Sequence, residues 1–248
     1  VAGGAAYAQT KSVNSTAAVT DSTASVTGGS FGAQTLLYGG KAETETDARS
    51  EAKALRNHLT FTTGNTVEEI YGGYAYADPT KTSFSLQANE NHLTAKAGAD
   101  RFFGGYAFGE QRADGTRVPL STAEANANIV TIAAGSGTFK NDSAAGYSDI
   151  GAKKAAAVTT AANANQLTIA GGTFKEAVYG GSTSAANDDA TGTATATARS
   201  NELWANGGTF QKRIGVGEGS ATTKAGAATT TASENKGIAD KMKSVRLA

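Results

Sequence analysis

The chain has 248 residues, no cysteine, 31 glycines and equal numbers of acidic and basic side chains, so its formal net charge is zero. This balance argues against nucleic acid or an anionic membrane as a partner held by bulk charge, and the lack of cysteine excludes thiol catalysis. No apolar run approaches the ~18 residues that a membrane-spanning helix needs, so we expect no direct membrane insertion.

Internal repeats organise the chain from one end to the other. The opening "VAGGAAYA" aligns with "IYGGYAYA" at 70–77 and is interpreted as the tail of an earlier unit. Later units resemble "NQLTIAGGTFKEAVYGG" at 165–181 and recur about every 35 residues. They begin at Ala24, Asn57, Asn91, Asn128, Asn165 and Asn201, and a last "NKGI" begins at Asn235. We expect residues 1–248 to form a single repeat domain, as a segment of a longer or processed chain.

Each unit divides into three segments that favour strands. In the first, "NQLTI", Leu167 and Ile169 alternate with polar residues, which is typical of a half-buried strand. A glycine turn follows, and the second segment, "TFKEAVY", leads to another glycine pair that we expect to turn the chain. The third segment is a low-complexity run such as "TATATAR" at 193–199. The stretch 43–57 occupies this third slot and favours a strand, although it also fits a short helix.

Three short strands in ~35 residues predict an all-β parallel β-helix (β-solenoid) of about six to seven coils. An antiparallel sandwich of repeats is the alternative. In a solenoid, equivalent side chains stack about 4.8 Å apart, and we expect the apolar ones to fill the coil interior. The predicted ladders are Val26, Leu59, Leu93, Val130, Leu167 and Leu203; Tyr38, Tyr71, Phe103 and Tyr179; and Phe31, Val67, Phe139, Phe174 and Phe210.

Asparagines head most of the units, and two interpretations of them stay open. In a ladder, each amide would donate a hydrogen bond to one neighbour and accept one from the other, while the backbone takes the left-handed bend of a coil corner. Alternatively, each asparagine simply fills a turn before a strand. The residues are Asn57, Asn91, Asn128, Asn165, Asn201 and Asn235.

Histidine and glycine motifs offer little chemistry. His58 and His92 occupy the same position in neighbouring units, which favours a surface stack over a catalytic pair. No spacing supplies the further ligands of a metal site, and we expect no metal and no cofactor. The run "GVGEGS" at 215–220 lacks a following lysine, so it is interpreted as the degenerate glycine turn of its repeat.

Paired carboxylates are the one catalytic possibility, because β-helix enzymes that cleave polysaccharides use clustered acidic groups. Asp188 and Asp189 favour a polar loop tip. Glu68 and Glu69 are adjacent in a predicted strand, so their side chains face opposite ways. We therefore predict no catalytic residues.

Two features could contact a partner. Trp204 replaces an outward threonine, where it could bind a partner or pack under a neighbouring loop, and we favour the packing. Polar loops at 77–83, 110–121 and 184–192 follow glycine-rich stretches, and we expect them along one edge of the solenoid. They are either binding loops or solvated connections.

The repeated "NxLTIxGGTFxxxVYGG" pattern, the absence of cysteine and the Thr/Ala/Asn/Gly-rich composition resemble the passenger regions of bacterial autotransporters and related large surface adhesins. The resemblance implies a right-handed β-helix that is exported and displayed outside the bacterial cell. It implies a non-enzymatic adhesive protein whose partner is a host surface protein, a glycan or a second copy of the chain. The alternatives are a subunit of an extracellular filament joined through solenoid ends and, third, a glycan-cleaving enzyme.

Overall fold

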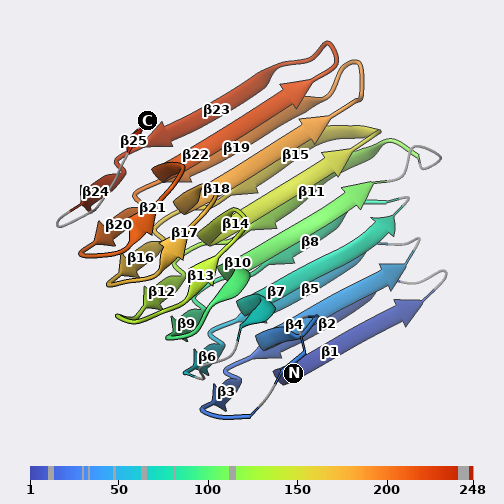
Figure 1. Ribbon diagram of the computed structural model, residues 1–248. Coiled ribbons are helices and arrows are strands. Elements are labelled where there is room, and N and C mark those ends of the chain that lie inside the picture. The colour runs from blue at the N-terminus through green and yellow to red at the C-terminus, as the bar shows by residue number, and fades with distance from the viewer. Residues whose placement is uncertain are drawn as a thin grey trace.

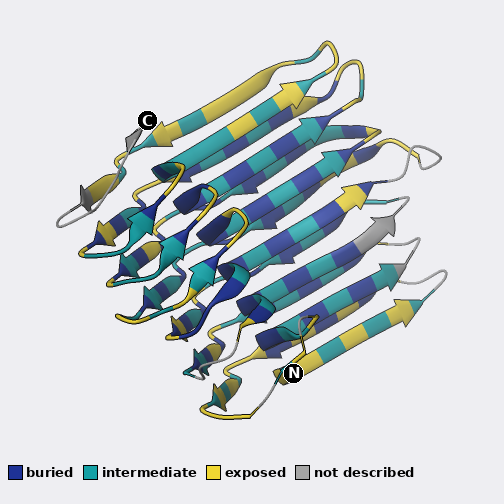
Figure 2. Ribbon diagram, viewed as in Figure 1, coloured by how far each residue is buried: buried dark blue, intermediate teal, exposed yellow. Residues whose placement is uncertain are grey.

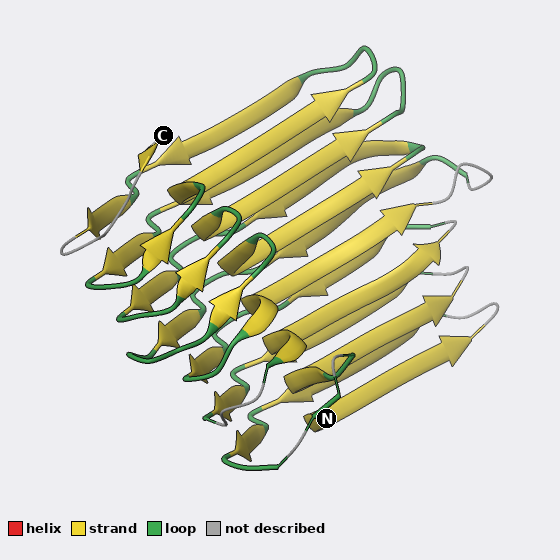
Figure 3. Ribbon diagram, viewed as in Figure 1, coloured by secondary structure: helices red, strands yellow, loops and turns green. Residues whose placement is uncertain are grey.

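The computed structural model describes residues 1–10, 14–29, 31–32, 34–46, 49–62, 66–80, 82–111, 116–239 and 246–247. Within these ranges the chain consists of strands, turns and loops without a helix (Figure 3). It forms a parallel β-solenoid of about six turns, with about 35 residues in each. The predicted fold class is confirmed, and the antiparallel alternative is wrong because strands pair in parallel in all three sheets. None of the described residues belongs to a helix able to cross a membrane.

Three sheets run along the solenoid, and each coil contributes to all of them (Figure 1). The first sheet contains β1 (Ala2–Thr10), β4 (Leu36–Thr46), β7 (Val67–Thr80), β10 (Ala99–Gln111), β14 (Ser143–Ala152), β18 (Val178–Asn187), β22 (Arg213–Thr223) and β25 (Arg246–Leu247), with the short β13 (Thr138–Phe139), β17 (Thr173–Phe174) and β21 (Thr209–Phe210) beside them. The second contains β2 (Ser15–Thr20), β5 (Ser50–Leu55), β8 (Phe84–Gln87), β11 (Val118–Glu124), β15 (Ala155–Ala161), β19 (Thr193–Arg199) and β23 (Ala228–Ser233). The third contains β3 (Thr23–Val26), β6 (His58–Phe61), β9 (His92–Ala95), β12 (Ile129–Ile132), β16 (Gln166–Ile169), β20 (Glu202–Ala205) and β24 (Lys236–Ala239).

The third sheet carries the aliphatic ladder. Its register aligns Leu59, Leu93, Val130, Leu167 and Leu203, all of them buried. The first rung differs from the prediction, because β3 places Ala24 beside Leu59 and Val26 beside Phe61. The unit therefore starts at Ser22, whose backbone N–H donates to Asn57 Oδ1.

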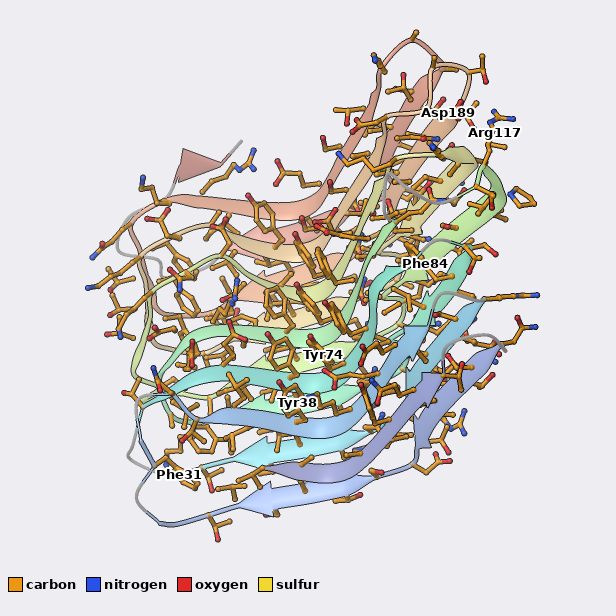
Figure 4. The ribbon with its side chains drawn as sticks, turned by 90° about the vertical axis from the view of Figure 1, so that its right-hand side faces the viewer. Phe31, Tyr38, Tyr74, Phe84, Arg117 and Asp189 are labelled. Carbon is orange, nitrogen blue, oxygen red and sulfur yellow. The ribbon has the colours of Figure 1, made fainter. Side chains whose placement is uncertain are left out.

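The long strands of the first sheet bend in the middle, where the glycine pairs lie (Figure 4). The expectation that these pairs turn the chain is met only as a bend within a strand, because Gly72 and Gly73 lie inside β7. The interpretation of "GVGEGS" as a turn is wrong, because it lies inside β22. Close approach explains the glycine: a Cβ on Gly73 would come within 2.3 Å of Asn91 Nδ2. The other predicted glycine turn is present, since Gly172 and Gly208 adopt φ of 102° and 106°.

The bend divides the interior into two apolar lobes. One lies between the first halves of the long strands and the third sheet and contains Leu37, Ile70 and Phe102. The other lies between their second halves and the second sheet and is mostly alanine, with Phe84 and Leu86. Buried residues alternate with partly exposed ones along the strands, and the buried residues mark the inward faces (Figure 2).

The asparagine ladder fills the narrow waist between the lobes. Asn128 Nδ2 donates to Asn165 Oδ1, and Asn165 Nδ2 donates to Asn201 Oδ1, each at 3.0 Å. The same pattern links Asn57 to Asn91, Asn91 to Asn128 and Asn201 to Asn235. The left-handed bend belongs to the residue before each asparagine instead. These six residues have φ between 53° and 58°: Arg56, Glu90, Ala127, Ala164, Ser200 and Glu234. Asp21, which precedes Ser22 at the head of the first unit, has φ of 55°.

Two further expectations are settled by the strand bounds. The stretch 43–57 contains the end of β4 and all of β5, so the strand prediction holds and the helix alternative is wrong. The polar loops are shorter than predicted, because 77–80, 110–111, 118–121 and 184–187 are strand. Where described, as at 188–192, the connections between the first and second sheets lie along one edge of the solenoid (Figure 1).

Candidate functional site: an aromatic groove

The bend makes the outer face of the first sheet concave, and aromatic side chains collect in the hollow. Tyr71 faces outward from the first half of β7, and Tyr74 faces outward just after the glycine pair. The bend brings their rings to 5.1 Å between centroids, with an interplanar angle of 81°. Figure 4 shows Tyr38 and Tyr74 near this bend, between the lobe of Phe31 and the lobe of Phe84. We call this hollow the aromatic groove.

The first ladder of the groove follows the predicted residues Tyr38, Tyr71, Phe103 and Tyr179. Tyr38 stacks on Tyr71 at 5.1 Å, and Tyr71 stacks on Phe103 at 5.6 Å. The prediction that these rings fill the coil interior is wrong. The strand alternates, so the preceding residue of each pair, such as Ile70, points inward, and the ring points outward.

A second ladder of rings, Tyr74, Tyr106 and Tyr147, runs beside the first and was missed by sequence reasoning. Tyr74 stacks on Tyr106 at 5.3 Å and Tyr106 on Tyr147 at 5.2 Å. The signal was visible, because each of these tyrosines directly follows the glycine pair or its equivalent, as in "GGYAYA". Without the bend, however, nothing indicated that they would meet the first ladder.

Burial keeps the phenol groups of the groove neutral. Loss of solvent raises the pKa of Tyr71 and Tyr74, and it raises the pKa of Tyr106 to about 12 although Arg101 opposes the shift. Neutral phenols retain a donor and an acceptor at physiological pH. The hydroxyl of Tyr71 donates to Glu69, and Tyr147 donates to Asp149 at 3.3 Å.

Charged side chains line the groove as well. Arg101 pairs with Glu69 and lies 5.9 Å from the ring of Phe103. Lys41 Nζ lies 2.9 Å from Glu43 and 5.2 Å from the ring of Tyr38. Cations beside aromatic faces and balanced by carboxylates give a surface that is polar and nearly neutral, suited to ligands with both apolar faces and hydrogen-bonding edges.

The remaining phenylalanine ladder lies inside the first lobe. Phe139, Phe174 and Phe210 stack at 5.0 Å and 4.7 Å between centroids. Ala99 pairs with both Phe139 and Val67 in the register, and Phe102 packs edge-on against Phe139. This ladder is part of the core and offers no surface.

The histidines lie outside the groove. The rings of His58 and His92 stack at 4.5 Å on β6 and β9, as predicted for a surface pair. Burial, with a smaller effect of His58, lowers the pKa of His92. In the part of the chain that the structure describes, no three His, Cys, Asp or Glu residues come close enough to hold a metal ion.

The candidate carboxylates Asp188 and Asp189 take part in two separate ion pairs. Asp188 pairs with Lys153 at 2.6 Å, and Asp189 pairs with Arg117 at 3.0 Å and accepts from the Thr191 backbone. The hydrogen bond from the Thr191 backbone lowers the pKa of Asp189 most, and the interaction with Arg117 lowers it further. Both aspartates lie at the edge connections (Figure 4 labels Asp189 and Arg117). Their ion pairs and hydrogen bonds hold the edge connections in place.

Trp204 lies on the outer face of the third sheet, in register with Thr168 and Ile238. It keeps 37% of its surface exposed, so the favoured expectation that a loop covers it is wrong.

Comparison of the chain with protein-family models, with curated proteins and with solved structures finds no match. The groove is therefore interpreted from its geometry alone.

Proposed function

We propose that this chain is a non-enzymatic adhesive and structural protein of the bacterial cell surface, in which a β-solenoid presents the aromatic groove to a host surface protein, a glycan or a second copy of the chain. The observation that supports this most directly is the groove itself. Rings from four successive coils, β4 to β14, form two continuous outward ladders. The rings of the first ladder are buried beneath those of the second, and Tyr74, Tyr106 and Tyr147 of the second ladder are partly exposed. A row of partly exposed rings is typical of a contact site.

The scaffold suits display because it fixes the coils that carry the groove relative to one another. Backbone pairing in three sheets and the buried amide ladder fix each coil on the next. A ligand that is itself extended can then contact several coils at once, and weak contacts add through multivalency. Neutral overall charge leaves recognition to local shape and hydrogen bonding.

Adhesion of the purified chain to host cells and to immobilised glycans tests the proposal. The double variant Tyr74→Ser with Tyr106→Ser removes the centre of the second ladder, and we expect it to lose adhesion. Trp204→Ser is the matched control, because it removes an exposed aromatic residue from another face. Adhesion that depends on Trp204 and not on the tyrosine pair would refute the proposal.

A further inference from the structure

The balance of charge around Lys41 and Arg101 does not extend across the whole groove. The outer face of the first sheet is acidic in the half that follows the bend. Alternation along the strands from β1 to β22 points six charged side chains outward there, among those that the structure describes. They are one lysine and five acids: Lys41, Glu43, Glu45, Glu110, Asp149 and Glu218.

Three of these carboxylates have no cation of the protein beside them. Ion pairs account for Glu43, which meets Lys41, and for Glu218, which meets an arginine on its own strand. Glu45 accepts hydrogen bonds from side chains of β1. Within the part of the chain that the structure describes, neither Glu45 nor the other two acids, Glu110 and Asp149, form an ion pair. This half of the groove therefore carries unpaired negative charge.

The rings next to Asp149 also lack a cation. Elsewhere in the groove a cation of the protein lies 5.2 to 5.9 Å from a ring centroid: Lys41 by Tyr38, Arg101 by Phe103 and Arg213 by Tyr179. Tyr106 and Tyr147 stack on each other at 5.2 Å, and no cation of the described chain lies over either of them. Tyr147 donates to Asp149 at 3.3 Å. The coil of β14 thus combines a ring and a carboxylate, as other coils do, but without the positive group.

Asp149 occupies this position at the expense of stability. It is only partly exposed, and burial raises its pKa although hydrogen bonds from Ser184 and Tyr147 oppose the shift. A group that destabilises the fold in its charged form is typical of a functional position. A positive ligand group beside it would favour the charged carboxylate, and the same group would gain from the faces of the neighbouring rings.

We propose that the acidic half of the aromatic groove binds an extended, lysine- or arginine-rich segment of a partner polypeptide, with one cationic side chain over Tyr106 and Tyr147 beside Asp149. The aliphatic stem of that side chain packs on the rings while its charged end meets the carboxylate. Glu110, in the neighbouring coil, adds negative charge at the same place. This inference rests on the proposed adhesive function and specifies the class of its partner.

The spacing of the unpaired carboxylates favours an extended polypeptide over a small cation. Glu45 on β4 and Asp149 on β14 are three coils apart, which is about 14 Å along the solenoid. A single ammonium group cannot reach both. Residues four apart in an extended chain are also about 14 Å apart, and their side chains lie on the same face. Two cations of one segment can therefore meet both ends of the acidic half, with the tyrosine row between them.

A peptide of alternating lysine and threonine is the probe, with an alternating glutamate–threonine peptide and spermine for comparison. Calorimetric titration of the whole chain gives the dissociation constants. The carboxylate variant, Glu110→Gln with Asp149→Asn, removes the two unpaired acids nearest Tyr147. It should fold, because Glu110 is exposed and asparagine can still accept from the Tyr147 hydroxyl. Glu124→Gln with Glu202→Gln is the matched control, because it changes the net charge equally on the outer faces of the second and third sheets.

We expect saturable binding of the lysine peptide, weakened about ten-fold by the carboxylate variant and unchanged in the control. The ring protons of Tyr106 and Tyr147 should shift in NMR spectra when the peptide is added. Lack of binding, equal weakening by the control, or binding without these shifts overturns the proposal. Spermine or the glutamate peptide binding as tightly as the lysine peptide also overturns it, since the site would then recognise a small polycation or a peptide regardless of charge.

Cell adhesion measured on the same variants separates this proposal from the adhesive function. Adhesion of the parent chain that persists in the absence of lysine-peptide binding refutes the cationic partner and leaves the adhesive function standing. Peptide binding with the expected variant effects, in a parent chain that does not adhere, refutes the adhesive function and leaves the cation site standing.

Discussion

Asn165 tests whether the amide ladder holds the waist of the solenoid. It is fully buried, and its Oδ1 accepts from both the backbone N–H and the Nδ2 of Asn128, each at 3.0 Å. Asn165→Ala leaves these two buried donors without their acceptor. An unsatisfied buried group costs about 1–3 kcal/mol, so we expect a loss of about 2–6 kcal/mol in the free energy of unfolding.

Asn163 is the matched control, because it lies two residues earlier and its Oδ1 accepts a single bond, from the Arg199 backbone at 2.9 Å. It is only partly buried, so Asn163→Ala should cost about 0.5–1.5 kcal/mol. Urea unfolding followed by circular dichroism compares the two variants, and amide exchange of the Asn128 backbone N–H reports the local effect. Equal losses for the two variants, or unchanged exchange at Asn128, would refute this account of the waist.

Three other changes test the bend, the groove and the corners. Gly73→Ala places a Cβ within 2.3 Å of Asn91 Nδ2, so it should cost about 1–3 kcal/mol or more, whereas Gly151→Ala meets its nearest atom at 3.8 Å and should leave the melting temperature unchanged or higher. Burial raises the pKa of Asp149 in the folded state, so its charged form destabilises the fold above the unfolded pKa of about 3.9. Asp149→Asn should therefore raise the melting temperature at pH 7, and the gain should vanish below pH ~3.9; a gain that persists in acid would contradict this. Ala164 is exposed and has φ of 54°, so Ala164→Gly should relieve strain and stabilise the fold by up to about 1 kcal/mol in urea unfolding; a loss of stability would show that the corner is unstrained.

Much of the architecture could be predicted from the repeat pattern. Alternation in "NQLTI" and "TATATAR" predicted strands, and similar steps of about 35 residues between units predicted that they stack in parallel. The errors came where the pattern is degenerate. In the first unit Ser22 replaces the leading asparagine, so alignment on apolar residues alone shifted the register and selected Val26 in place of Ala24.

The candidate site could be predicted only in part. Tyr38, Tyr71 and Phe103 were recognised as a ladder, but their side of the strand was assigned from the expectation that apolar residues lie inside. That expectation fails where a sheet is concave, because outward rings are then buried by one another. The first ladder is interrupted at Ala144, in "SAAG", and only the register, which aligns Ala144 with Phe103 and Tyr179, shows which ladder it interrupts.

The sequence by itself determined the period, the strand content and which residues are equivalent, because stacked coils must repeat the same chemistry at the same step. Only the tertiary structure decided the bend, the waist and the outward groove. These depend on the contact between the second glycine of each pair and an asparagine about 17–23 residues further along the chain, as Gly73 meets Asn91. A local pattern cannot specify a contact of this kind, since either partner alone is compatible with an ordinary turn.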